Sequence, residues 1–87
     1  MPSYLAHINV MLRPLVNDPQ GLAVRDGLHA LGFEGVTAVR VGKRIDVTLD
    51  ASTAADADQQ VHQMCDRLLA NAVIEDYEFT VSEVVGV

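Results

Sequence analysis

The three histidines of this chain are among the residues best suited to chemistry. His7, His29 and His62 lie far apart in the sequence, and no pair of them has the spacing of metal ligands on one helix or strand. Asp58, His62 and Asp66 are four residues apart and would share one face of a helix. Two acids around a histidine could hold a weakly bound metal. The same pattern is typical of a solvent-exposed helix face with favourable pairs, and we expect that here.

The single cysteine and a glycine-lysine pair are the other candidates. Cys65 lies on an apolar helical stripe, and no base that could activate its thiol is its neighbour in sequence. Gly42 and Lys43 lack the upstream glycines of a phosphate-binding loop. With Arg40 they would form either a turn with charges in solvent or a basic knob that docks on an acidic partner. No nucleophile is paired with a base, so the residues predict an interaction module without catalytic residues.

The composition indicates one small acidic domain over residues 1–87. Apolar residues make up 49% of the chain, whereas aromatic residues make up only 5%. Twelve acidic residues against six basic ones give a net charge of −6, which disfavours nucleic acid and anionic membranes as partners. One cysteine excludes an internal disulfide. No signal-peptide pattern and no bilayer-spanning apolar run are present, so we expect a cytoplasmic protein.

Local patterns predict the first half of the fold. Residues 4–13 alternate as a strand with one face on a core and a mixed second face. Asp18 and Pro19 begin a first helix, which runs to about Leu31 and ends at a Gly32 cap. Its apolar stripe consists of Val24, Leu28 and Leu31, widened by the small residues Ala23, Gly27 and Ala30.

The second half is predicted in the same way. Val36, Ala38 and either Val39 or Val41 would belong to a second strand, and Ile45, Val47 and Leu49 alternate as a third. A tight turn at Gly42-Lys43 would join the two strands, which indicates a hairpin. Ser52 or Thr53 caps a second helix. Residues 77–82 alternate as a fourth strand, and we expect the end at Gly86-Val87 to be frayed.

This order of elements predicts an α+β fold, a ferredoxin-like βαββαβ variant with one antiparallel sheet and two helices on one face. The other face would be open and would carry Leu5 and Met11. An exposed apolar sheet face favours an oligomer, formed through that face or through strand edges. A ferredoxin-like regulatory domain that binds a small molecule in a pocket between subunits is the alternative to an interaction module.

Three segments resemble the PurS family, the small subunit of phosphoribosylformylglycinamidine (FGAM) synthase. They are residues 16–21 (VNDPQG), 39–43 (VRVGK) and 68–77 (LLANAVIEDY). The last segment is the most specific, and it contains a bend without glycine or proline that side-chain contacts must hold. The resemblance covers nearly the whole chain. It departs from the family at Ala72, where many relatives are expected to carry threonine, and in the short tail after residue 83.

The resemblance implies a subunit without catalytic residues in an ATP-dependent C–N ligase of the glutamine amidotransferase type. The full enzyme would convert formylglycinamide ribonucleotide (FGAR), ATP and glutamine to FGAM in the fourth step of purine synthesis. PurL would be the synthetase that uses ATP and magnesium, and PurQ the glutaminase that releases ammonia. This chain would bridge them and help ammonia to pass between their active sites, without a cofactor or metal of its own. It would form a homodimer or a dimer of dimers.

The matching segments cluster at turns and element ends, where partners are usually contacted. Asp18 could instead only cap the first helix, and Tyr77 could instead pack in the core or in a dimer. The candidate docking residues are Asp18, Gln20, Arg40, Lys43, Asn71, Glu75, Asp76 and Tyr77.

Overall fold

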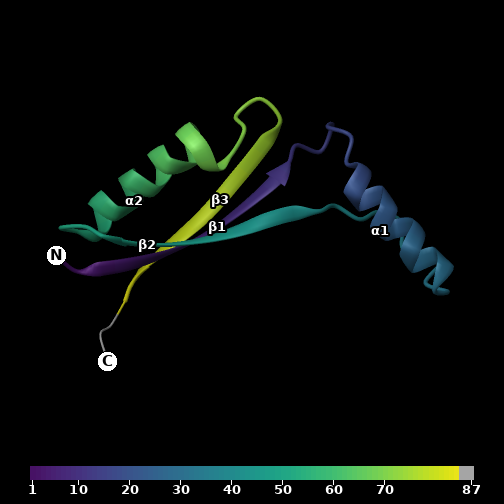
Figure 1. The fold of residues 1–87 in the computed structure, drawn as a ribbon, viewed down its shortest axis with the longest axis horizontal. Coiled ribbons are helices and arrows are strands. Elements are labelled where there is room, and N and C mark those ends of the chain that lie inside the picture. The colour runs from purple at the N-terminus through teal and green to yellow at the C-terminus, as the bar shows by residue number, and fades with distance from the viewer. Residues whose placement is uncertain (85–87) are drawn as a thin grey trace.

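The structure is a computed structural model that describes residues 1–84, so the frayed end expected at Gly86-Val87 lies outside the described residues. The chain order is strand, helix, strand, helix, strand (Figure 1). One π-helical turn continues the second helix directly. The elements are β1 (Ser3–Leu12), α1 (Pro19–Ala30), β2 (Gly42–Asp50), α2 (Ala54–Met64), the π-helical turn η1 (Cys65–Leu69) and β3 (Glu75–Glu83).

The three strands form one antiparallel sheet with β1 in the middle, in the order β2-β1-β3. Val10 of β1 lies between Lys43 of β2 and Tyr77 of β3. Side chains that lie opposite each other point to the same face of a sheet. One face therefore carries the even-numbered residues of β1 together with the odd-numbered residues of β2 and β3.

The core lies between this face and α2. Val61 and Cys65 are inaccessible to solvent and pack against Ala6, Ile8 and Val10, which are equally buried. The predicted second helix is confirmed, and its N-cap is Thr53, whose side chain accepts a hydrogen bond from the Asp56 amide at 3.1 Å. α2 packs over β1 and β3 rather than over β2. Within the described residues, no helix combines the length and the apolar character needed to cross a membrane.

The opposite face of the sheet is more polar than the sequence pattern indicated. Leu5 and Met11 lie on it, but His7 of the same strand lies between Asp46 and Thr80. The His7 Nδ1 atom is 2.8 Å from a carboxylate oxygen of Asp46. The odd-numbered residues of β1 are thus surrounded by polar residues, because the even-numbered residues of β2 and β3 that lie beside them are mostly polar.

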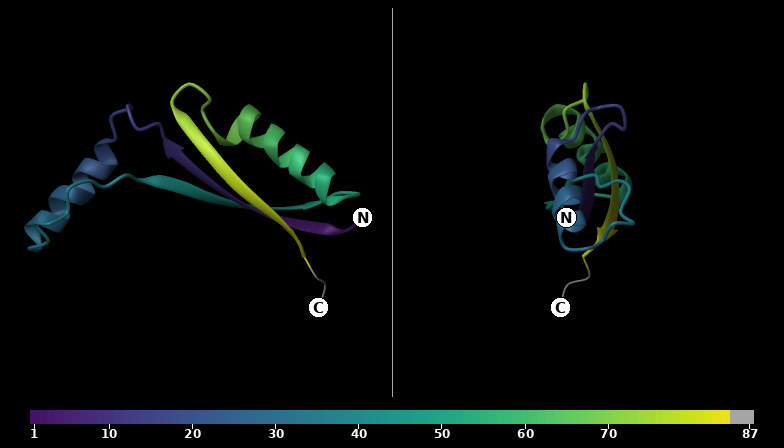
Figure 2. Two further views of the ribbon diagram at one scale, coloured as in Figure 1. Left: turned by 180° about the vertical axis from the view of Figure 1, so that it is seen from behind. Right: turned by 90° about the vertical axis from the view of Figure 1, so that its right-hand side faces the viewer.

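The α+β class with a ferredoxin-like antiparallel sheet is confirmed, but the placement of both helices on one face is wrong. α1 lies beyond the end of the sheet where β1 ends and β2 begins, and it does not cover the sheet (Figures 1 and 2). The helix itself begins and ends as predicted. Asp18 is its N-cap, Pro19 its first residue, and Gly32 follows it with a left-handed φ of 99°.

The predicted hairpin and its first strand are also wrong, because the described chain forms three strands and not four. Residues 36–41 run back beside α1 in an irregular conformation, with the carbonyl of Val36 2.7 Å from His29 Nε2. A Cβ at Gly21 would collide with the carbonyl oxygen of Val39, which shows how closely this segment crosses the helix start. Val36, Val39 and Val41 of this segment are half-buried, whereas Thr37, Ala38 and Arg40 are exposed, so the covered side chains do not alternate as in a strand.

Candidate functional site

The structure gathers the predicted docking residues at one end of the sheet. We call this surface the sheet end, and it comprises residues 12–18, 40–43 and 71–77. The antiparallel register brings the segments together, since Gly42 lies opposite Met11, and Met11 lies opposite Asp76. Of the eight candidates, Gln20 alone lies outside this surface, on the exposed first turn of α1. Lys43, Glu75 and Tyr77 are on the α2 side of the sheet, whereas Asp76 is on the other side.

Asn71 organises the bend that leads into β3. Its side-chain oxygen accepts a hydrogen bond from the Val73 amide at 3.0 Å, and its carbonyl accepts from the Glu75 amide at 2.8 Å. In return, the Asn71 amide donates to the Glu75 carboxylate at 2.7 Å. The expectation that side-chain contacts hold this bend is therefore confirmed.

The π-helical turn η1 precedes this bend and was not predicted. The amide of Ala70 donates to the carbonyl of Cys65 at 3.0 Å, which closes the wide turn. Such turns are uncommon and occur often at functional sites. Here the turn ends directly before the bend at Asn71 that leads into β3.

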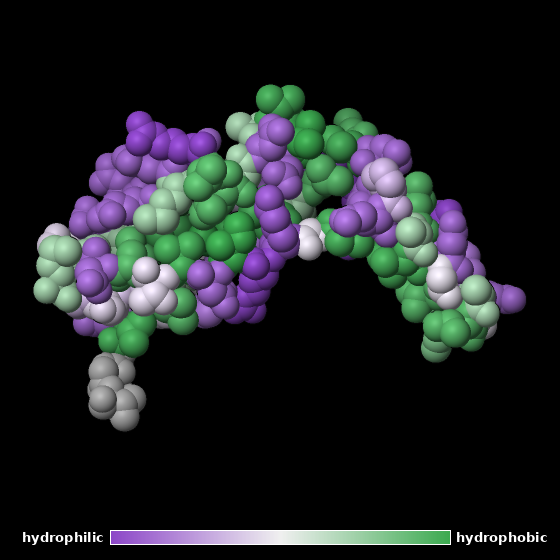
Figure 3. All heavy atoms as spheres, in the orientation of Figure 1, coloured by the Kyte–Doolittle hydropathy of each residue, from purple (hydrophilic) through white to green (hydrophobic). Residues whose placement is uncertain are grey.

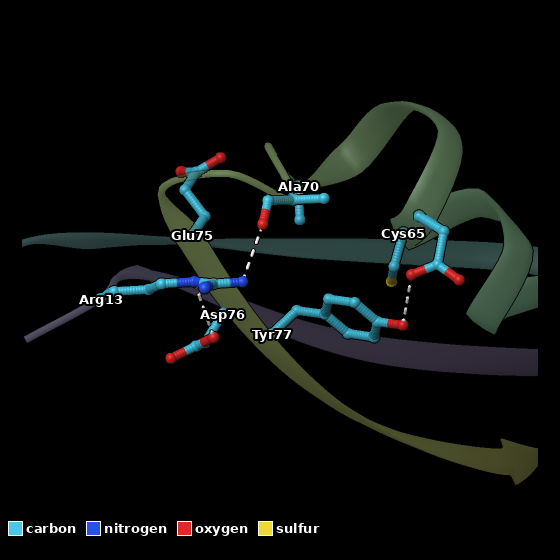
Figure 4. Close-up of a pocket in the computed structure, with 8 residues that line it drawn as sticks. Arg13, Cys65, Ala70, Glu75, Asp76 and Tyr77 are labelled. Atoms are coloured by element: carbon cyan, nitrogen blue, oxygen red, sulfur yellow. Dashed lines mark hydrogen bonds and ion pairs between the residues drawn. The ribbon is translucent and has the colours of Figure 1, made fainter.

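Arg13 is a residue of this surface that the sequence reasoning missed. One of its guanidinium nitrogens donates to the carbonyl of Ala72 at 2.7 Å. Another lies 3.4 Å from Asp76 (Figure 4). The sequence signal that could have identified Arg13 was its position next to Pro14 at the end of the strand, in a chain with only six basic residues. Together these side chains border a half-open hollow of about 350 Å³, which is lined by Arg13, Cys65, Asp66, Ala70, Ala72, Glu75, Asp76 and Tyr77.

Tyr77 joins the hollow to the core. Its hydroxyl donates to Asp66 at 2.8 Å and lies 2.9 Å from His62 Nδ1, while its ring is stacked near Phe79 with centroids 6.3 Å apart. Burial and the bond to Asp66 raise the pKa of Tyr77 to about 12. His62 and Asp66 form an i,i+4 pair at 3.4 Å, as expected for an exposed helix face with favourable pairs. Much of Tyr77 is thus engaged within the chain.

Asp18 and Arg40 fasten the start of α1 to the segment that precedes β2. Asp18 is only 4% exposed, and its carboxylate accepts hydrogen bonds from the amides of Gly21 at 3.0 Å and Val41 at 2.8 Å. The bond from Val41, followed by that from Gly21, lowers the pKa of this carboxyl. Arg40 donates to the carbonyls of Arg13 and Val16, each at 3.0 Å, and lies 3.9 Å from Asp18.

The predicted basic knob is therefore divided in two. Arg40 is bound to the main chain, and it does not sit in a hairpin turn. Lys43 is 54% exposed, with its Nζ atom 4.0 Å from Glu75, so it can reach another molecule. Arg44 points to the other face of the sheet and contacts Asp46 at 3.1 Å.

The remaining reactive residue, Cys65, is fully buried, and burial raises the pKa of its thiol. The protonated form that this favours is a poor nucleophile. Over residues 1–84, no three side chains of His, Cys, Asp or Glu gather as metal ligands. The sheet end thus combines a fixed bend, an exposed lysine and several carboxylates.

Comparison with known proteins identifies the family. Residues 5–83 match the PurS family model, described as phosphoribosylformylglycinamidine (FGAM) synthase. A Synechocystis protein named phosphoribosylformylglycinamidine synthase subunit PurS is 52% identical over 97% of this chain and 84% of its own length. The Bacillus subtilis protein of the same name is 45% identical over 95% of this chain and 98% of its own. A chain in the structure of PurLQS from Thermotoga maritima superposes with a TM-score of 0.84 at 33% identity, over 97% of this chain and all of the other. The chain therefore belongs to the PurS family.

Proposed function

We propose that this chain is the non-catalytic small subunit of FGAM synthase, which converts FGAR, ATP and glutamine to FGAM in the fourth step of purine synthesis. The match to the PurS family over residues 5–83 carries the proposal. The likeness to a chain of the Thermotoga maritima PurLQS structure adds the two partners, PurL and PurQ. The chain bridges the PurQ glutaminase and the PurL synthetase, as part of an ATP-dependent C–N ligase. ATP and magnesium are used by PurL, and this chain needs neither.

The physical need for such a subunit lies in the ammonia that passes from PurQ to PurL. Ammonia in water near neutral pH is largely protonated, and ammonium is a poor nucleophile. Closing the path between the active sites keeps water out and keeps ammonia reactive. A small subunit can close a path by filling a cleft between two larger ones, without an acid or base of its own. Because its partners make a precursor of nucleotides, we place the complex in the cytoplasm, with residues 1–87 acting as one domain.

We propose the sheet end as the surface that docks on the partners. Gln20 and Lys43 are exposed, and so are Asn71 and Asp76, so these four are available for direct contact. Glu75 holds the bend, and Tyr77 supports it from the core side. Asp18 and Arg40 contribute indirectly, because they fix the position of α1 relative to the sheet.

The test is FGAM formation by cognate PurL and PurQ with and without this chain, supplied either with glutamine or with ammonia. We expect the chain to restore the glutamine reaction and to leave the ammonia reaction unchanged. If neither reaction responds to the chain, the proposed function is wrong.

The docking surface is tested by reversing the charge of Lys43. Lys43→Glu should weaken assembly with PurL and PurQ, which ultracentrifugation detects, and should lower the glutamine reaction by tenfold or more at limiting subunit. Arg44→Glu is the matched control, since it reverses the neighbouring charge on the opposite face of the sheet. Unchanged assembly and activity in Lys43→Glu would remove this residue from the docking surface.

A further inference from the structure

Three consecutive apolar residues at the bend before β3 lie in solvent. We call Ala72, Val73 and Ile74 the bend tip, and all three are exposed, Val73 by 79%. Leu68 on the preceding turn is 83% exposed, and Leu15 beyond the end of β1 is fully exposed. Figure 3 shows hydrophobic residues at the top of the molecule, where the bend lies in Figure 1. A run of exposed apolar residues favours aggregation, so it is expected only where it has a function.

The bend tip has a fixed shape. The guanidinium of Arg13 donates to the carbonyl of Ala72 at 2.7 Å, and its main-chain amide donates to the carbonyl of Ile74 at 2.8 Å. The side-chain oxygen of Asn71 accepts from the Val73 amide at 3.0 Å, and its carbonyl accepts from the Ile74 amide at 3.1 Å. Four polar backbone groups of the tip are thus bound within the chain, while the apolar side chains stay in solvent. A surface that is ordered before binding loses less conformational entropy when it binds.

The charges around the bend tip indicate the kind of partner. Glu75 and Asp76 follow the tip directly, and residues 46–87 contain nine acidic residues and one basic residue. Arg13 is paired with Asp76 at 3.4 Å. Lys43 belongs to β2, the far edge strand of the sheet, and its Nζ atom lies 4.0 Å from Glu75. These two bases only offset the two acids, so the border of the tip is acidic overall. An apolar tip with an acidic border fits an apolar recess with a basic rim.

A second copy of this chain does not offer such a recess in its hollows. Three hollows on the described residues, with volumes of about 260 to 350 Å³, are each bordered by charged or amide side chains. Asp76 lines two of them, and Arg67 lines the third. The bend tip projects from the end of the sheet, so two tips that met each other would bury little area (Figure 1). A different protein is therefore the expected partner of the tip.

We propose that the bend tip inserts Val73 into an apolar recess with a basic rim on a partner subunit of FGAM synthase. Arg13 is the positioning residue of this contact, because it binds the carbonyls on both sides of Val73. The inference rests on the proposed function, since it adds an apolar centre to a docking surface whose other candidate residues are mostly polar. Interfaces between proteins commonly combine an apolar centre with a polar rim.

Val73→Asn tests the bend tip without changing the charge. The side chain is 79% exposed, so its replacement leaves no cavity and should not alter unfolding in urea. We expect the dissociation constant for PurL or for PurQ, each measured separately by calorimetry, to rise by about tenfold or more. Val84→Asn is the matched control, because it makes the same change at an exposed valine beyond the other end of β3, and it should bind like the parent. Binding of Val73→Asn to both partners as tightly as the parent would overturn the proposal.

A double-mutant cycle tests the role of Arg13. Arg13→Gln removes the charged donor to Ala72 and the pair with Asp76, and it should weaken binding to the same partner. If Arg13 acts by holding Val73 in place, the double variant binds no more weakly than Val73→Asn alone. Losses that add would show that Arg13 acts elsewhere, and they would overturn its role as the positioning residue.

Two further measurements separate the possible partners of the tip. Sedimentation of the chain alone should be unchanged in Val73→Asn, whereas weaker self-association would show that a second copy covers the tip and would overturn the proposal. Raising the salt concentration should weaken binding of the parent, because salt screens the attraction between the acidic border and the basic rim. Binding that does not depend on salt would exclude the basic rim. A parent chain that binds neither PurL nor PurQ would reject the proposed function and this inference together, whereas a parent that binds no better than Val73→Asn would reject the inference alone.

Discussion

Replacing Arg40 with glutamine should release the start of α1 from the segment that precedes β2. The guanidinium donates to the carbonyls of Arg13 and Val16 at 3.0 Å each and lies 3.5 Å from that of Leu12. Glutamine is shorter and uncharged, so it cannot reach the same carbonyls. The substitution therefore leaves these acceptors to solvent and separates residues 13–16 from the segment around residue 40.

The magnitude follows from the two short bonds. A hydrogen bond that involves a charged group contributes about 1.5–3 kcal/mol, and less where water competes. Because the Arg40 side chain is 34% exposed, we expect Arg40→Gln to lower the free energy of unfolding by about 2 kcal/mol in total. In a domain of this size, that change lowers the midpoint temperature by about 10 °C.

Urea unfolding followed by circular dichroism measures the effect. Arg44→Gln is the matched control, since the Arg44 side chain is 59% exposed and its ion pair with Asp46 should contribute less than about 1 kcal/mol. Both variants are compared at one protein concentration, because the stability of an oligomer depends on concentration. Equal midpoints for Arg40→Gln and Arg44→Gln would refute the conclusion that the bonds of Arg40 to the main chain stabilise the fold.

Two further predictions concern titrating groups. Tyr77→Phe should lower the free energy of unfolding by about 1 kcal/mol in urea, since the bond to Asp66 is lost. Because the pKa of Tyr77 is raised to about 12, the stability that the neutral hydroxyl contributes is present below pH 10 and is lost as the pH rises through 12. If the parent and Tyr77→Phe show the same dependence of unfolding on pH in this range, the prediction is wrong. The amides of Val41 and Gly21 lower the pKa of Asp18, so its contribution is present above about pH 4 and is lost in stronger acid. The free energy of unfolding of Asp18→Asn should therefore fall less steeply below about pH 4 than that of the parent. Equal slopes for the two chains would show that Asp18 does not contribute to the loss of stability in acid.

Strong local signals explain which parts of the fold could be predicted. Asp18 before Pro19 determines the start of α1, Thr53 determines that of α2, and alternation identifies β1 and β3. Residues 36–41 are rich in valine like a strand, yet they form none, because they run beside α1 and not beside a strand edge. Closely spaced apolar side chains indicate that a segment is covered on one side, and they do not indicate whether a sheet or a helix covers it.

The candidate site divides along a similar line. The contacts of Asn71 with Val73 and Glu75 span few residues, so a bend without glycine or proline was enough to predict them. The contacts of Arg13 and Arg40 join segments that meet only at the sheet end. They depend on the register of three strands and on the π-helical turn, for which the sequence carries no local signal.

The position of α1 shows a further limit of prediction from one sequence. An apolar stripe along a helix predicts that the helix is covered, but not that its own chain covers it. The stripe of α1 could have been covered by the half-buried Ile45, Val47 and Leu49 of β2, which is why a sheet with two helices on one face was the natural prediction. The bonds of Arg40 and Asp18 instead hold the start of α1 against the segment that precedes β2, and they favour the extended position. These bonds join residues 13–18 to residues 40–41, and no local pattern in the sequence predicts a contact between segments so far apart.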